Sequence, residues 1–132
     1  MLFCVLTMLF PISACLAQQL DNSVTSVQVP NNTTAVIIAP GSHRVVSIEV
    51  FNNSTSVAYL KLYDAATQTC GSGTPKARYL IGGSTNGLAG PPGVPLSDLY
   101  INGIAACVTT GFADSDTTAP AASQFIYNIH WR

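Results

Sequence analysis

The chain has 132 residues, of which 8% are charged, and five Lys plus Arg against six Asp plus Glu give a net charge of −1. The length fits a single domain. So few cationic side chains form no basic patch to neutralise phosphates, which argues against nucleic acid as a partner. An average domain is about 25% charged, and a surface this poor in charge suits extracellular proteins and oligomeric assemblies, because little charge has to be buried at their contacts.

The chain begins with an apolar segment, residues 1–17, that contains no charged side chain. It has the length of a signal peptide and is shorter than the roughly 20 apolar residues that a membrane span requires. The small residues that end at Ala17 resemble a cleavage site, whereas residues 12–15 resemble a bacterial lipobox, in which Cys15 is acylated. Because no Lys or Arg precedes the apolar run, a start codon placed too early is the third interpretation.

The next segment, residues 18–33, is rich in Ser, Thr and Asn and predicts a polar extended arm with one strand over residues 24–29. From residue 34 to residue 132, short runs of alternating apolar and polar residues are separated by turn residues, which predicts one β domain. Its strands are expected over residues 34–39, 43–52, 56–64, 77–81, 94–101, 104–110 and 124–131. The pattern predicts an all-β fold, a two-layer antiparallel β-sandwich or jelly roll of about eight short strands.

Two of these segments show which residues share one face of their strand. In residues 43–52, a period of two places Val46, Ile48 and Val50 on one face. In residues 56–64, the same period places the apolar side chains on the core face. These are Ala58, Leu60 and Leu62.

The opposite face of residues 56–64 is a candidate contact face, made of Tyr59, Lys61 and Tyr63. A lysine on that face indicates that water or a protein partner lies next to it. The alternative is that the two tyrosines pack inward against a second layer.

The sequence contains no arrangement of residues that is typical of catalysis. His43 and His130 lack a nucleophile signature such as Gly-x-Ser-x-Gly, and both are expected to be structural. Asp114 and Asp116 have a spacing that calcium ligands use, but a solvated turn whose carboxylates cap backbone N–H groups is the preferred interpretation. We therefore predict a protein that is not an enzyme, with no catalytic residue, no cofactor and no metal site.

Outside the leader the chain has two cysteines, Cys70 and Cys107. Two cysteines in an exported domain predict a disulfide. The competing interpretation is a buried free thiol at Cys107, because this residue lies in an apolar strand. Two cysteines and two scattered histidines lack the spacing of a zinc finger.

Four segments resemble small uncharacterised proteins encoded by tailed bacteriophages. They are SIEVFNNS at residues 47–54, AYLKLYDAAT at residues 58–67, GIAACVTTGFADSDTTAPAA at residues 103–122 and NIHWR at residues 128–132. The resemblance covers most of the chain from residue 34 onward, and its more specific patterns are YLKLYD and GxADxDTxA. It carries no known catalytic residue, so it transfers no site.

The resemblance implies a virion structural protein, such as a capsid decoration, head-fibre or tail-associated domain, whose partners are other virion protein subunits or further copies in a homo-oligomer. The apolar leader departs from the phage pattern. The alternative is therefore an exported extracellular module that binds a sugar or a cell-surface ligand and is secreted or periplasmic after removal of residues 1–17. A membrane is a partner only through the leader, if that segment is retained or lipidated. A small hydrolase is the third hypothesis.

Overall fold

The computed structural model describes residues 23–28, 35–83, 94–122 and 124–132, so the expected leader lies outside the described residues. Within these ranges the chain forms strands and no helix, and hence no helix that is long and apolar enough to cross a membrane. The strands are β1 (Ser23–Gln28), β2 (Val36–Pro40), β3 (His43–Asn52), β4 (Ala58–Asp64), β5 (Ala77–Ile81), β6 (Val94–Tyr100), β7 (Gly103–Thr109) and β8 (Phe125–Trp131). The predicted all-β class is confirmed.

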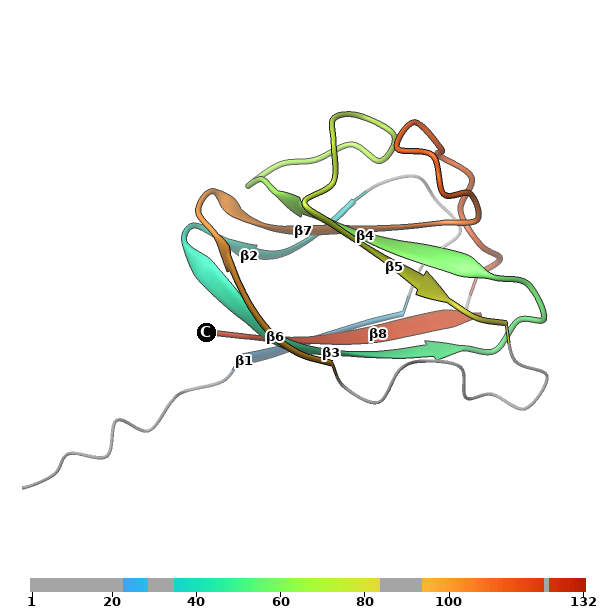
Figure 1. Ribbon diagram of the computed structural model, residues 1–132, viewed down its shortest axis with the longest axis horizontal. Helices are drawn as coiled ribbons and strands as arrows, with labels where there is room; N and C mark the ends of the chain where they lie inside the picture. The colour runs from blue at the N-terminus through green and yellow to red at the C-terminus, as the bar shows by residue number, and fades with distance from the viewer. Residues whose placement is uncertain (1–22, 29–34, 84–93, 123) are drawn as a thin grey trace, which may run out of the picture.

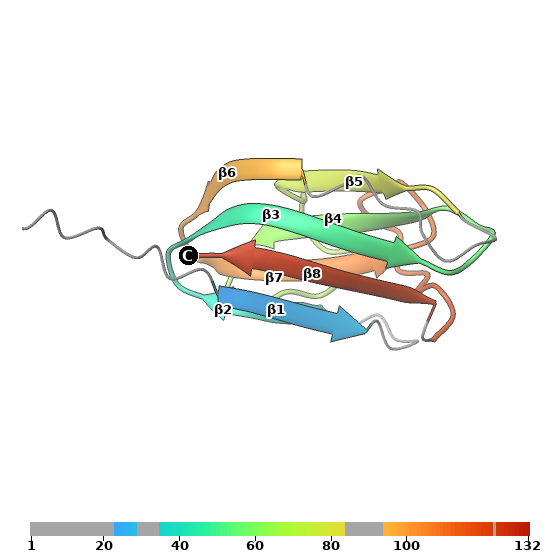
Figure 2. The ribbon, with the colours of Figure 1, turned by 90° about the horizontal axis from the view of Figure 1, so that it is seen from below.

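The strands form two antiparallel four-stranded sheets, with the orders β1-β8-β3-β6 and β2-β7-β4-β5, and the two sheets lie face to face (Figure 1). The pairs β1–β8, β2–β7, β3–β6 and β4–β5 are those of one long hairpin, folded over so that its successive pairs alternate between the sheets. This strand order is that of a jelly roll. Figure 2 shows the β1-β8-β3-β6 sheet from its outer side.

The strand expected within the polar arm is part of the sandwich. β1 pairs with β8 along its whole length, from Ser23 opposite Trp131 to Gln28 opposite Ile126. The Trp131 indole Nε1 also donates a hydrogen bond to the Thr25 hydroxyl, at 3.0 Å. The first sheet therefore begins at Ser23 and not at residue 34.

A β-bulge in β3 corrects the predicted alternation of that strand. The pairing with β8 shifts between Val45 and Ser47, which lie opposite the consecutive residues Trp131 and His130, so Val46 is an extra residue against β8. The pairing with β6 shifts at the same place, but there the extra residue belongs to β6. The buried residues are consequently Val45, Ile48 and Val50, while Val46 is only partly buried. A strict period of two places Val46 on the wrong face, because it does not allow for the inserted residue.

The core between the sheets contains the inward residues of β4, as predicted, together with large side chains from both sheets. β7 is buried on both of its faces. Ile104, Ala106 and Val108 belong to the core between the sheets. Ala105 and Cys107 belong to a second, smaller apolar cluster on the outer side of the β2-β7-β4-β5 sheet. The connection after β4 and the loop after β7 lie over this outer face (Figure 1).

Two isoleucines three residues apart test the importance of the core between the sheets. Ile104 is fully buried and Ile101 is 63% exposed. Ile104→Ala is expected to lower the free energy of unfolding by about 2–5 kcal/mol, because it leaves a cavity. Ile101→Ala is expected to change it by less than about 0.5 kcal/mol. Urea unfolding followed by circular dichroism measures both values, and equal losses would contradict this account of the core.

Candidate functional site

The outer face of the β2-β7-β4-β5 sheet carries the densest set of charged contacts in the part of the chain that the structure describes. The register of β4 and β5 places Lys61 directly opposite Arg78, and β7 places Cys107 on the other side of Lys61. Like charges directly opposite each other on one sheet face are destabilising. Because Lys61 is also fully buried, its charge has to be compensated by protein groups outside the sheet.

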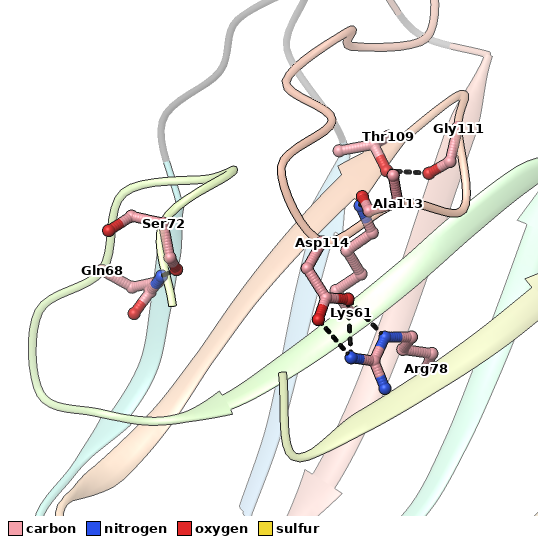
Figure 3. A network of polar contacts seen from close by, with 8 residues as sticks. All are labelled: Lys61, Gln68, Ser72, Arg78, Thr109, Gly111, Ala113 and Asp114. Carbon is pink, nitrogen blue, oxygen red and sulfur yellow. Dashed lines mark hydrogen bonds and ion pairs between the residues drawn. The ribbon is translucent and has the colours of Figure 1, made fainter. Parts of the chain in front are cut away.

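The loop over residues 110–122 supplies these groups (Figure 3). The Lys61 ammonium donates a hydrogen bond to the carbonyl oxygen of Ala113, at 2.6 Å. The Arg78 guanidinium donates from Nε and Nη2 to the two carboxylate oxygens of Asp114, at 2.7 and 2.6 Å. This paired geometry is the strong, charge-assisted form of the Arg–carboxylate contact. Successive residues of the loop therefore hold the two neighbouring cations of the sheet.

Asp116 fixes the shape of the same loop. Its carboxylate accepts hydrogen bonds from the backbone N–H groups of Gly111, at 2.7 Å, and Thr118, at 3.3 Å. The Thr109 hydroxyl donates to the carbonyl oxygen of Gly111, at 2.9 Å. A side chain at position 111 would place its Cβ 2.9 Å from the Asp116 Cγ, so glycine lets the carboxylate approach the backbone. Asp114 thus serves as the ion-pair partner of Arg78, and Asp116 caps backbone N–H groups of the turn.

Burial and neighbouring charges shift the ionisation of these groups. Burial lowers the pKa of the Lys61 ammonium below its ordinary value, although the charges of Asp116 and Asp114 oppose the shift. Burial alone would raise the pKa of the Asp116 carboxyl. The hydrogen bonds from Gly111 and Thr118, with the charge of Lys61, outweigh burial and leave that pKa below its ordinary value.

The connection over residues 65–76 is held on the same outer face by a disulfide. Cys70 and Cys107 are bonded, with an S–S distance of 2.20 Å and a Cα–Cα distance of 5.7 Å. Both residues are buried in the small outer cluster with Tyr63 and Ala105. Cys107 is therefore not a free thiol in this structure, and its bond fastens the connection to the doubly buried strand β7.

Asp64 ties the end of β4 to the turn between β6 and β7. Its Oδ1 accepts hydrogen bonds from the N–H groups of Ile101 and Asn102, at 2.8 and 2.7 Å, and its Oδ2 lies 3.6 Å from the Lys76 ammonium. The Lys76 ammonium also lies 4.7 Å from the centre of the Tyr100 ring. Since that turn passes from one sheet to the other, these contacts join the two layers at one end.

The expected contact face of Tyr59, Lys61 and Tyr63 needs correction. Lys61 is fully buried, and Tyr63 is 3% exposed. Both side chains point outward from the sheet as predicted, but the chain's own loops cover them, so neither water nor a partner surface meets Lys61. Tyr59 alone is partly exposed, and its ring packs edge-on against Phe112 with 5.7 Å between the ring centres.

Sequence reasoning did not single out Arg78 or Phe112, which complete this site. The Asp-x-Asp spacing drew attention to the loop, but nothing local in the sequence indicated which strand it would cover. The register of β4 and β5 decides that, because it places Arg78 next to Lys61.

The two histidines take part in structural contacts. His43 Nε2 lies 2.8 Å from the carbonyl oxygen of Pro40, and its ring packs edge-on against Trp131 at 4.5 Å. His130 Nε2 lies 3.8 Å from a carboxylate oxygen of Glu49. No cluster of three or more His, Cys, Asp or Glu side chains that could hold a metal ion occurs within the described ranges.

Comparison with known proteins gave no relative: no family model, no curated protein and no solved structure matches this chain. The site is therefore interpreted from its own geometry.

The buried cation gives a pH test. Because the folded-state pKa of Lys61 is lowered, the unfolded chain binds more protons in the window between that pKa and the ordinary value of 10.5. The contribution of Lys61 to stability therefore improves as pH rises through this window. We expect the free energy of unfolding of the wild type, minus that of Lys61→Met, to increase from about pH 7 to about pH 10.

Urea unfolding at several pH values, followed by circular dichroism, measures this difference. Lys76→Met removes an exposed lysine and is the matched control. Burial raises the pKa of Tyr63, Tyr100 and Tyr127, which lowers stability as pH rises toward their range. Subtracting a variant from the wild type cancels this opposite effect, because both chains contain these tyrosines. A difference for Lys61→Met that stays constant with pH would contradict burial of the charged lysine.

The disulfide is expected to contribute substantially to stability. The two cysteines are separated by 37 positions, and loop-closure entropy then corresponds to about 3–4 kcal/mol. The double variant Cys70→Ala, Cys107→Ala should lose about this much free energy of unfolding in denaturant titrations. Adding a thiol reductant to the unfolding buffer should weaken the wild type and leave the double variant unchanged. A loss below about 1 kcal/mol would show that the bond adds little to the fold.

Proposed function

We propose that the chain is a non-enzymatic structural protein of a virion, such as a capsid decoration, head-fibre or tail-associated domain, that acts through contacts with other protein subunits. The observation that carries this proposal is the strand order of a jelly roll, a fold common to viral capsid domains. This is an argument by analogy of fold. It agrees with the resemblance of four sequence segments to small phage proteins.

The charged residues of the outer sheet face hold loops in place, which supports a structural role in binding. Lys61, Arg78, Asp114 and Asp116 are engaged in holding one loop on the sheet, and the disulfide holds the other. In this arrangement the charged side chains around Lys61 are already paired. Such pairing favours a stable scaffold over acid–base chemistry, which requires groups that exchange protons with a substrate.

The exposed apolar side chains support contact with other proteins. Phe112, Ile101 and Leu80 are each more than 60% exposed. Large exposed apolar side chains mark interaction sites when they gather into a patch. An interface built from them needs little charge to be desolvated, in keeping with a chain that is only 8% charged.

A second candidate function is an exported module that binds a sugar or a cell-surface ligand. The disulfide between Cys70 and Cys107 favours it, because disulfides persist mainly in oxidising compartments. The jelly roll also occurs in lectin domains. In this case the mature chain would start near Gln18 and be secreted or periplasmic.

Mass spectrometry of purified particles tests the virion proposal. Particles produced from the genome that encodes this chain should contain it in a fixed ratio to the coat protein, and the ratio should survive density-gradient purification and a salt wash. Retention at high salt is expected because salt screens attraction between charges, and a contact that contains few charges depends little on such attraction.

The culture supernatant of the same cells is the matched sample. A free chain that begins at Gln18 in this fraction, together with its absence from the particles, would reject the virion proposal and favour the exported module.

A further inference from the structure

The connection over residues 65–76, here called the disulfide loop, lies next to the loop over residues 110–122, here called the acidic loop (Figure 1). They touch at Gly71, whose φ of 81° is a left-handed conformation that favours glycine. A Cβ at position 71 would lie 3.0 Å from the Ser115 carbonyl oxygen and would overlap the Thr117 methyl group. The residue that follows Cys70 is therefore packed directly against the loop that covers Lys61.

The other half of the disulfide stands beside the buried lysine. Cys107 is the cross-strand partner of Lys61, and it belongs to the apolar cluster on the outer side of the sheet. The acidic loop begins three residues after Cys107, and its backbone is closed by the N–H of Thr110, which donates to the Thr118 carbonyl oxygen at 2.8 Å. The disulfide, the contact at Gly71 and the cover of Lys61 thus adjoin one another on one sheet face.

The disulfide loop buries little besides its cysteine. Within residues 65–76, only Cys70 and Pro75 are buried, and the others are exposed or half-buried. Segments with few buried apolar contacts open locally at a small cost in free energy. The covalent bond is therefore the main restraint that keeps the middle of the disulfide loop, and with it the contact at Gly71, on the sheet.

The acidic loop is held mainly by polar contacts. Within residues 110–122, only Pro120 is buried. The contacts to the sheet run from the Ala113 carbonyl oxygen to Lys61 and from Asp114 to Arg78. Such contacts weaken when water reaches them, because a higher dielectric constant reduces the attraction between the charges. The acidic loop consequently depends on the neighbouring disulfide loop to keep water away from one side of it.

We propose that the two loops form a single cover that opens as a unit, with the disulfide between Cys70 and Cys107 as its redox-sensitive latch. The reductant is a dithiol, which is oxidised to its own disulfide while each cysteine takes up one electron and one proton to become a thiol. The disulfide loop then leaves the sheet, the acidic loop loses its support at Gly71, and the Lys61 ammonium meets water. In an oxidising compartment the latch is closed, so export from a reducing cytoplasm seals this face. The inference goes beyond the proposed virion role and does not depend on it.

Amine labelling of the folded full-length chain tests the latch, because the lysines of the sequence are Lys61 and Lys76. An N-hydroxysuccinimide ester is added at neutral pH with and without a dithiol, and mass spectrometry follows both lysines and the state of the disulfide. Labelling of Lys61 should become about tenfold faster or more with the dithiol, and each factor of ten corresponds to about 1.4 kcal/mol of lost local stability. Lys76, whose side chain is 38% exposed, is the internal control and should change far less. The double variant Cys70→Ala, Cys107→Ala should be labelled at the high rate under both conditions.

Two glycine variants test whether the loops move together. Gly71 and Gly73 both have a positive φ, but a Cβ at position 73 would meet nothing within 4 Å. Gly71→Ala should therefore speed the labelling of Lys61 severalfold in the oxidised chain, because it pushes the two loops apart. Gly73→Ala introduces a similar backbone strain in the same loop without that contact, and it should leave the labelling rate unchanged.

Circular dichroism shows whether the sandwich persists when the latch is open, and a retained β-sheet spectrum is expected in the dithiol. Loss of that spectrum on reduction would overturn the proposal, and so would a disulfide that the dithiol does not reduce in the folded chain. Protection of Lys61 that survives reduction would show that the bond is not the latch. Equal labelling rates for Gly71→Ala and Gly73→Ala would show that the loops do not open as a unit.

Discussion

Burial of the Lys61 ammonium is the constraint on which one side of this molecule depends. An isolated buried charge is very costly, and Lys61 also stands opposite a second cation, Arg78, on the same sheet face. The loop after β7 resolves both problems by giving a carbonyl oxygen to Lys61 and a carboxylate to Arg78. Removing Asp114 would leave Arg78 without its counter-charge, and removing the Ala113 carbonyl would leave the buried Lys61 ammonium unpaired, so the loop stabilises the sheet that it covers.

On the same side of the sandwich, the disulfide holds a loop over the outer face of the sheet. β7 is central in its sheet and is buried on both faces, so its outward residues need a cover just as its inward residues do. The connection that contains Cys70 supplies part of that cover, and the bond to Cys107 prevents it from lifting off. The charged contacts and the disulfide act on different loops over one sheet face. Together they keep the outer face of the β2-β7-β4-β5 sheet covered by the chain's own loops.

The sequence was informative about what is local and silent about what is long-range. The alternation in residues 56–64 correctly separated Ala58, Leu60 and Leu62 from the outward residues, because side-chain direction follows from the strand alone. It did not indicate that Lys61 lies under a loop, because the loop comes from a part of the chain 52 positions away. The bulge at Val46 was missed for a related reason, since an extra residue becomes visible only against the partner strand β8. Two cysteines outside the leader suggested a pair, whereas the pairing of Arg78 with Asp114 required the register of β4 and β5.

The two outer faces of the sandwich differ in whether the chain's own loops cover them. On the β1-β8-β3-β6 sheet, Glu49 accepts a hydrogen bond from Asn128 at 3.2 Å and lies near His130, which is typical of a face that is hydrated. On the other sheet, the face around Lys61 and Tyr63 is already covered by the chain itself. On this side of the sandwich, Phe112 near the start of the covering loop and Leu80 on the edge strand β5 remain exposed, so apolar contact surface is available there at the rim of the sheet.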